Sequence, residues 1–156
     1  MKDRANIRFA PTKGNPVKPD YIILHHSATA DGKTLSWDDI RRYHREVNEW
    51  RDIGYQLGIE LVENETVILM GRMLDETGAH CVGMNNRSIG ICFVGNFDLI
   101  EPPKEAWDAG IRLVRSLCQV FNIPNENVKG HRDYAQKTCP GLLFDLDKFR
   151  NALKEV

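Results

Sequence analysis

The chain has 156 residues, of which 42% are hydrophobic and 28% charged, and its formal net charge is -1 at pH 7. These proportions suit a single globular domain that is long enough to bury a core. The near-zero charge argues against nucleic acid as the main partner, because nucleic-acid binding rests on a positive surface, and no apolar run reaches the ~20 residues that a membrane-spanning helix needs.

Residues 1–20 form a predicted N-terminal extension that contains several prolines and basic residues. The extension lacks the apolar segment of a secretory signal. As a basic arm it would help the protein to reach an anionic polymer, whereas as a solvated tail it would have no binding role. We therefore expect a folded domain at 21–156, synthesis in the cytoplasm and no membrane insertion.

The apolar run at 21–25 predicts a buried strand that ends at His25 and His26. Adjacent strand residues point to opposite faces, so at most one of these histidines can face a given site. Ser36 is a predicted helix cap. The apolar stripe of the following helix comprises Ile40, Tyr43, His44, Val47 and Trp50. On this stripe His44 is expected to be a buried, hydrogen-bonded histidine rather than a metal ligand.

Residues 54–61 and 66–69 are predicted to form a hairpin, and the apolar run at 88–94 is typical of a central strand. A long helix is expected from Pro103 to near Pro124, and Asp145 is placed to cap a last helix. The predicted order is therefore a strand, a helix, three strands, a helix, a loop and a last helix. The pattern predicts the α/β class, with a mixed central sheet and helices packed on its faces.

The four cysteines are Cys81, Cys92, Cys118 and Cys139. We expect reduced thiols, since the spacing shows no dense disulfide framework. Cys92 and Cys118 fall on apolar segments and are expected to be small buried side chains. Cys139 differs, because it lies on a polar loop that also carries His131 and Lys137.

Two kinds of chemistry fit this loop. With His25 at the end of the first strand, His131 and Cys139 would make a zinc site with three protein ligands and an open position for water. Alternatively, Cys139 would be a nucleophile with a histidine as its base, which requires a thiolate of lowered pKa. The residues alone leave both alternatives open.

Together with other segments, these residues resemble the zinc-dependent N-acetylmuramoyl-L-alanine amidases of type 2. This superfamily includes the amidase-type phage lysozymes and the peptidoglycan recognition proteins. The likeness extends from about Tyr21 to Phe149. The matching segments, in chain order, are Ile23–Ala28, Tyr43–His44, Asp52–Tyr55, Gly78–His80, Asn85, Ser88–Ile91, Val94–Gly95, Gly130–Arg132 and Lys137–Gly141.

The resemblance implies one zinc ion per chain, with His25, His131 and Cys139 as its ligands. Non-catalytic recognition members of the superfamily typically lose the cysteine, which this chain keeps. The resemblance also implies activity-related roles for Tyr55 and Lys137. The glutamate that some bacterial relatives use has no match here, so these two residues are expected to supply the polar assistance.

The resemblance further places His80 and Asn85 along the substrate cleft, where we expect them to contact the peptide. The expected reaction is hydrolysis of the amide bond between N-acetylmuramic acid and L-alanine in bacterial peptidoglycan. We expect a monomeric phage or prophage endolysin that is made in the host cytoplasm and acts at the cell wall. A cytoplasmic amidase that recycles muropeptides and a non-catalytic peptidoglycan-binding module are the alternatives.

Overall fold

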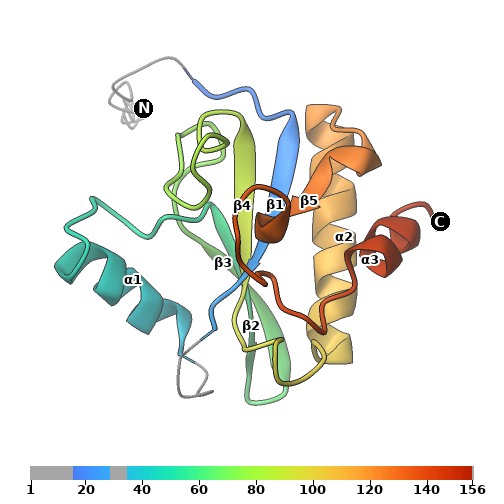
Figure 1. The fold of residues 1–156 in the computed structure, drawn as a ribbon, viewed down its shortest axis with the longest axis horizontal. Helices are drawn as coiled ribbons and strands as arrows, with labels where there is room; N and C mark the ends of the chain where they lie inside the picture. The colour runs from blue at the N-terminus through green and yellow to red at the C-terminus, as the bar shows by residue number, and fades with distance from the viewer. Residues whose placement is uncertain (1–15, 29–34, 156) are drawn as a thin grey trace, which may run out of the picture.

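A mixed sheet forms the centre of the computed structural model, which describes residues 16–28 and 35–155 (Figure 1). Its strands are β1 (Tyr21–His26), β2 (Leu57–Val62), β3 (Glu65–Met70), β4 (Ser88–Phe93) and β5 (Val128–Gly130). The order across the sheet is β3-β2-β4-β1-β5. β1 runs parallel to β4 and β5, β2 runs parallel to β4, and β3 is antiparallel to β2. The predicted α/β class with a mixed sheet is confirmed.

Helices cover both faces of this sheet. The helices in the described part of the chain are α1 (Trp37–Glu46), α2 (Lys104–Phe121) and α3 (Leu146–Ala152), with short 3₁₀ turns η1 (Asn125–Asn127) and η2 (His131–Asp133). α1 lies on one side of the sheet, and α2 and α3 lie on the other (Figure 1). None of these helices is both long and apolar enough to cross a membrane.

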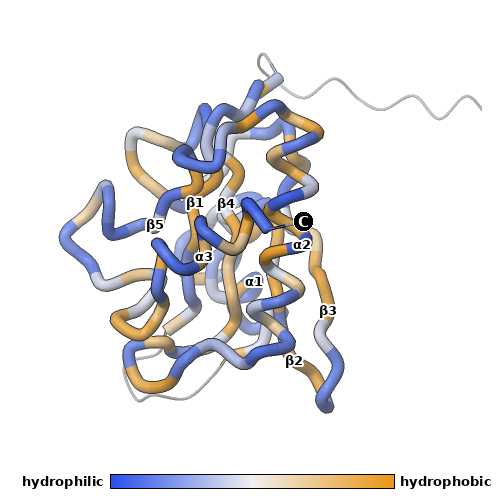
Figure 2. The backbone as a smooth tube through the Cα atoms, turned by 90° about the vertical axis from the view of Figure 1, so that its right-hand side faces the viewer, coloured by the Kyte–Doolittle hydropathy of each residue, from blue (hydrophilic) through white to orange (hydrophobic). Residues whose placement is uncertain are grey.

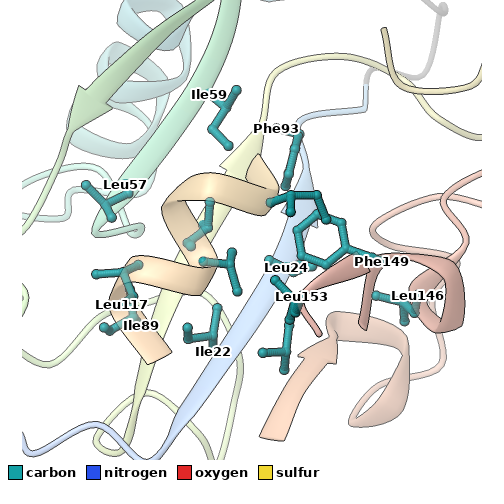
Figure 3. Packing of buried hydrophobic residues seen from close by; sticks show 14 of the residues in the cluster. Ile22, Leu24, Leu57, Ile59, Ile89, Phe93, Leu117, Leu146, Phe149 and Leu153 are labelled. Carbon is teal, nitrogen blue, oxygen red and sulfur yellow. The ribbon is translucent and has the colours of Figure 1, made fainter. Parts of the chain in front are cut away.

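The main hydrophobic core lies between the sheet and helices α2 and α3 (Figure 3). β4 is buried along its whole length, as predicted for a central strand. Alternate residues of β4 pack into this core: Ile89, Ile91 and Phe93. The other three residues of the strand face the side of α1: Ser88, Gly90 and Cys92. Figure 2 shows hydrophobic segments in the central strands and many hydrophilic segments in the outer turns.

Helix α1 begins as predicted, but less of its apolar stripe is buried than expected. The Ser36 hydroxyl accepts a hydrogen bond from the Asp39 N–H, and the Asp39 carboxylate accepts one from the Ser36 N–H, which is a capping box. The helix ends at Glu46, and Tyr43 and Val47 are 54% and 61% exposed. Trp50, which is 36% exposed, lies beyond the end of the helix, so the stripe prediction was wrong at these three positions, because the helix buries only its first turn.

The sequence analysis missed β5 and placed the start of β2 three residues early. No strand is predicted at Val128–Gly130, yet this segment pairs in parallel with β1. Three residues are too few to show the alternation by which a strand is recognised. Residues 54–56 precede β2 without joining its ladder to β3, since the pairing begins at Leu57 opposite Met70.

Part of the predicted N-terminal extension packs on the domain. The Val17 N–H donates to the carbonyl of Asp75 at 2.8 Å, and Val17 and Pro19 are buried. Residues 1–15 lie outside the described part of the chain, so the role expected for the arm stays a prediction.

Candidate metal centre

β1 delivers His25 to the α1 side of the sheet and His26 to the opposite side. His25 is 1% exposed and contacts the rings of Tyr55 and His131. The Nδ1 atom of His26 accepts a hydrogen bond from the Phe97 N–H at 3.0 Å, within the main core. The alternation of the strand therefore separates the two neighbours as predicted, and only His25 faces the site.

β5 brings His131 beside His25. In the parallel pairing of β1 with β5, Leu24 lies opposite Gly130. His25 and His131 follow these two residues directly, and their ring centroids are 4.7 Å apart. A strand that the sequence analysis missed therefore aligns two of the predicted ligands.

Arg132 holds the loop with Cys139 against the turn that contains His131. The Arg132 N–H donates to the Cys139 carbonyl at 2.8 Å. Its guanidinium donates to the carbonyls of Gly141 at 2.7 Å and Phe144 at 2.9 Å. Hydrogen bonds from a charged donor are stronger than neutral ones, so Arg132 couples the positions of the second histidine and the cysteine.

Asp98 clamps the same loop from the β4 side. One carboxylate oxygen of Asp98 accepts from the Thr138 hydroxyl at 2.9 Å, and the other accepts from the Leu142 N–H at 2.8 Å. These contacts bracket Cys139. The loop is thus held on both sides of its thiol.

The three predicted ligands fit a zinc ion. Ligand atoms of His25, His131 and Cys139 all lie within 4.8 Å of one another, and Nδ1 of His25 is 3.7 Å from Sγ of Cys139. With Zn–N and Zn–S bonds of about 2.05 and 2.3 Å, such atoms lie about 3.6 Å apart on a tetrahedral ion. This group of two imidazoles and one thiol could therefore hold a metal ion, and its donor set suits zinc.

The ionisation of the ligands also suits a metal. Burial lowers the pKa of His25 well below its ordinary range, and the neighbouring rings of His80 and His131 lower it further. Burial, with the positive charge of Lys137, lowers the pKa of His131. Both imidazoles are therefore neutral at pH 7, which is the form that binds a metal.

The same environment argues against Cys139 as a nucleophile. Burial raises the pKa of the Cys139 thiol to about 11. A cysteine nucleophile needs a thiolate at neutral pH without the help of a metal, whereas a bound Zn²⁺ itself deprotonates a coordinating thiol. Of the two chemistries that the residues left open, the metal-ligand arrangement is the one that this geometry supports.

Tyr55 faces the cluster from the loop before β2. Its ring centroid is 5.1 Å from that of His25, and burial raises the pKa of its hydroxyl well above 10. Tyr55 is thus a hydrogen-bond donor at neutral pH. Lys137 is exposed. Burial is the main cause of the lowered pKa of His131, and the nearby ammonium of Lys137 lowers it further.

His80 and Asn85, predicted to contact substrate, support the site from behind. His80 is 8% exposed, and its Nδ1 lies 2.9 Å from Nε2 of His25. The side-chain carbonyl of Asn85 accepts hydrogen bonds from the N–H groups of His80 and Cys81 at 2.8 and 2.9 Å. The peptide contact expected of these two residues stays a prediction.

His44 is hydrogen-bonded as expected, but it is half-buried rather than buried. Its Nδ1 accepts from the Gly54 N–H at 3.0 Å, and its ring is half-buried against Trp50 and Tyr55. The four cysteines are free thiols, as expected, and Cys92 and Cys118 are buried.

Sequence reasoning assigned no role to Asp98 or Arg132. Arg132 did carry a signal, since it lies inside the matched Gly130–Arg132 segment, next to a predicted ligand. Asp98 follows the end of the central strand, where side chains often enter a site, but nothing local links it to a loop 40 residues away.

The comparisons with known proteins agree with this geometry. The N-acetylmuramoyl-L-alanine amidase family matches residues 14–142. The chain is 30% identical over 152 residues to the endolysin of Enterobacteria phage T3, covering 93% of this chain and 91% of that protein. It is 32% identical over 129 residues to peptidoglycan-recognition protein LB of Drosophila melanogaster, covering 78% of this chain but only 54% of that protein. The chain therefore spans about half the length of this second relative.

Solved structures show the same fold. The N-acetylmuramoyl-L-alanine amidase LysC from Clostridium intestinale URNW superposes with a TM-score of 0.80 at 28% identity, covering 96% of this chain and 94% of that one. A mutant of Drosophila PGRP-LB in complex with tracheal cytotoxin superposes with a TM-score of 0.69 at 28% identity, covering 84% and 79%. The sequence match, the shared fold and the cluster of two histidines and a cysteine agree, and the chain belongs to the N-acetylmuramoyl-L-alanine amidase family.

Proposed function

We propose that this protein is a zinc-dependent amidase that cleaves the bond between N-acetylmuramic acid and L-alanine in bacterial peptidoglycan. The observation that carries this proposal is the cluster of His25, His131 and Cys139 within an amidase fold. One zinc ion per chain would be held by these three side chains. When bound, zinc lowers the pKa of a water molecule toward ~7 and polarises the amide carbonyl.

Tyr55 and Lys137 would complete the site. Tyr55 keeps its proton at neutral pH and faces His25, so it can donate a hydrogen bond to the oxygen on which negative charge develops. Lys137 lies two residues before Cys139 on the same loop, and its ammonium would stabilise that charge as well. His80 and Asn85 would contact the peptide of the substrate, as the family resemblance implies.

The kinship with phage proteins supports an endolysin. The T3 endolysin is covered over 91% of its length. We propose a monomer that is made in the host cytoplasm, reaches the cell wall and degrades it. The muropeptide-recycling amidase and the non-catalytic binding module are the rival functions, and each predicts a different product pattern.

Analysis of digested cell wall separates these functions. Incubation with insoluble peptidoglycan should give new N-terminal alanine and intact glycan strands by mass spectrometry. New reducing ends would indicate a glycosidase. Cleavage restricted to soluble anhydro-muropeptides would indicate a recycling enzyme, and binding without any new ends would indicate a recognition module.

The zinc requirement is tested by chelation and by the Cys139→Ser variant. Removal of the metal should abolish hydrolysis, and added zinc should restore it. Cys139→Ser replaces the thiolate with a poor zinc ligand in nearly the same volume, so it should keep the fold, judged by circular dichroism, and lose the metal. Undiminished hydrolysis by this variant would rule out the proposed metal site.

A further inference from the structure

His80 is a buried imidazole that takes no direct part in the proposed reaction. It lies in the loop between β3 and β4, and its ring packs over the α1 side of β4. A Cβ atom at Gly90 would lie 2.6 Å from the His80 ring, and so would one at Gly78. Two glycines thus leave room for this ring, directly behind His25.

A chain of hydrogen bonds runs from the backbone to His25 through His80. The Ser88 hydroxyl lies 2.6 Å from the Met84 carbonyl, which can only accept. Ser88 Oγ is also 3.4 Å from Nε2 of His80, and Nδ1 of His80 is 2.9 Å from Nε2 of His25. This series of hydrogen bonds connects Ser88 on β4 to the predicted metal ligand His25 on β1.

The direction of this chain follows from proton counting. A hydroxyl has one proton, and Ser88 donates it to Met84, so Ser88 must accept from Nε2–H of His80. A neutral imidazole carries one N–H, so Nδ1 of His80 is an acceptor. The proton between the two rings therefore belongs to Nε2 of His25, and the lone pair of its Nδ1 faces Cys139.

We propose that His80 is a positioning residue that keeps His25 in the Nε2-protonated tautomer and so leaves Nδ1 of His25 free to bind zinc. Metal-bound histidines commonly donate their other N–H to a fixed acceptor, which sets both tautomer and ring orientation. Here the acceptor is a second imidazole, itself held by Ser88. This inference rests on the zinc site of the proposed function.

Zinc affinity of variants tests this role. His80→Leu removes the acceptor and leaves the buried N–H of His25 without a partner, so zinc affinity measured by chelator competition should fall about 10- to 100-fold. His80→Asn places an amide oxygen near the position of Nδ1 and should recover most of the loss. Ser88→Ala removes the hydroxyl that accepts from Nε2–H of His80 and should weaken zinc binding less than His80→Leu does.

A matched control separates this role from a general loss of a buried histidine. His44→Asn removes another half-buried histidine near Tyr55 and keeps an acceptor for the Gly54 N–H. Its zinc affinity should equal that of the unchanged protein. Equal zinc affinity of His80→Leu, or no recovery in His80→Asn when both variants fold, would overturn the proposal.

The tautomer is measured directly in the metal-free protein. Long-range ¹H–¹⁵N correlation spectra should show the proton of His25 on Nε2 and that of His80 on Nε2. A proton on Nδ1 of His25 would contradict the proposal, even if the enzyme were active. Conversely, a protein with the expected tautomers and zinc affinities but no amidase activity would refute the proposed function and leave the role of His80 intact.

Discussion

At the scale of single residues, the site combines neutral imidazoles with a protonated phenol. The buried imidazoles of His25 and His131 do not need to lose a proton before they bind a metal, because burial lowers the pKa of each. Tyr55 is the opposite case, since burial raises the pKa of its hydroxyl and keeps it a donor. The low-dielectric setting of the site thus selects the uncharged form of both kinds of group.

Removal of the Tyr55 hydroxyl should affect turnover and leave metal binding unchanged. Tyr55→Phe keeps the ring that packs against His25 and removes one donor to the developing negative charge. The loss of such a donor lowers kcat by about 10²- to 10³-fold. Steady-state kinetics together with zinc quantification would measure both effects.

Tyr43→Phe is the matched control for this variant, because Tyr43 is 54% exposed on α1. It should have the kcat of the unchanged protein. If Tyr55→Phe retained full kcat with zinc bound, the donor role of Tyr55 would be excluded.

At the scale of elements, the candidate metal centre joins a strand end to a loop that has no regular structure of its own. β1 and β5 align His25 with His131 through their pairing. The cysteine depends on side chains instead, since Arg132 and Asp98 hold the loop that contains it. A loop needs such contacts because it lacks a ladder of backbone hydrogen bonds.

Asp98→Ala should loosen this loop and weaken zinc binding. It removes acceptors from the Thr138 hydroxyl and the Leu142 N–H, and a typical hydrogen bond contributes about 0.5–1.5 kcal/mol. We expect a loss of about 1–2 kcal/mol in the free energy of unfolding and faster hydrogen exchange at Leu142. Urea unfolding and exchange measurements would show this.

Two variants serve as controls for the clamp. Asp98→Asn keeps an oxygen for the Leu142 N–H and should lose less stability than Asp98→Ala. Asp108→Ala removes an exposed ion pair with Lys104 on α2, which should change stability by less than about 1 kcal/mol. A loss at Asp98 no larger than at Asp108 would mean that the clamp has no effect.

At the scale of the whole molecule, all five histidines are partly or wholly buried in one fold. Burial is the first cause that lowers their pKa values, and the pKa of His80 falls to about 3. In the unfolded chain these side chains would bind a proton near pH 6.5. The folded protein therefore binds fewer protons than the unfolded chain does below that pH.

This difference makes the metal-free protein sensitive to acid. Stability that is complete above about pH 6.5 should be lost as the pH falls toward the lower folded pKa values, because the unfolded state takes up more protons. Below about pH 6.5, each histidine that stays neutral in the fold lowers the free energy of unfolding by about 1.4 kcal/mol per pH unit. Urea unfolding of chelator-treated protein at pH 7 and pH 5.5 would measure the loss.

The His26→Asn variant is the control for this pH dependence. An asparagine oxygen can still accept from the Phe97 N–H, but the side chain no longer titrates. Its stability should therefore change less between pH 7 and pH 5.5 than that of the unchanged protein. Equal stability of the unchanged protein at both pH values would contradict the assignment of buried, neutral histidines.

The sequence by itself determined the α/β class, the central strand at 88–93, the caps at Ser36 and Asp145, and the family with its three candidate ligands. These features have local signals, because apolar periodicity, capping side chains and matched segments can be read without knowing the neighbours. The alternation of β1 likewise predicted that His25 and His26 would face opposite sides.

Only the tertiary structure decided how the site is assembled. β5 is too short to show a period, and its strand character comes from pairing with β1. The exposure of Tyr43 depends on how α1 meets the sheet. The resemblance places His80 along the substrate cleft, but its position behind His25 depends on contacts with Gly90 and Ser88 across the fold. Contacts between segments far apart in the chain have no local signature, so the partners of each ligand emerge only when the strands are side by side.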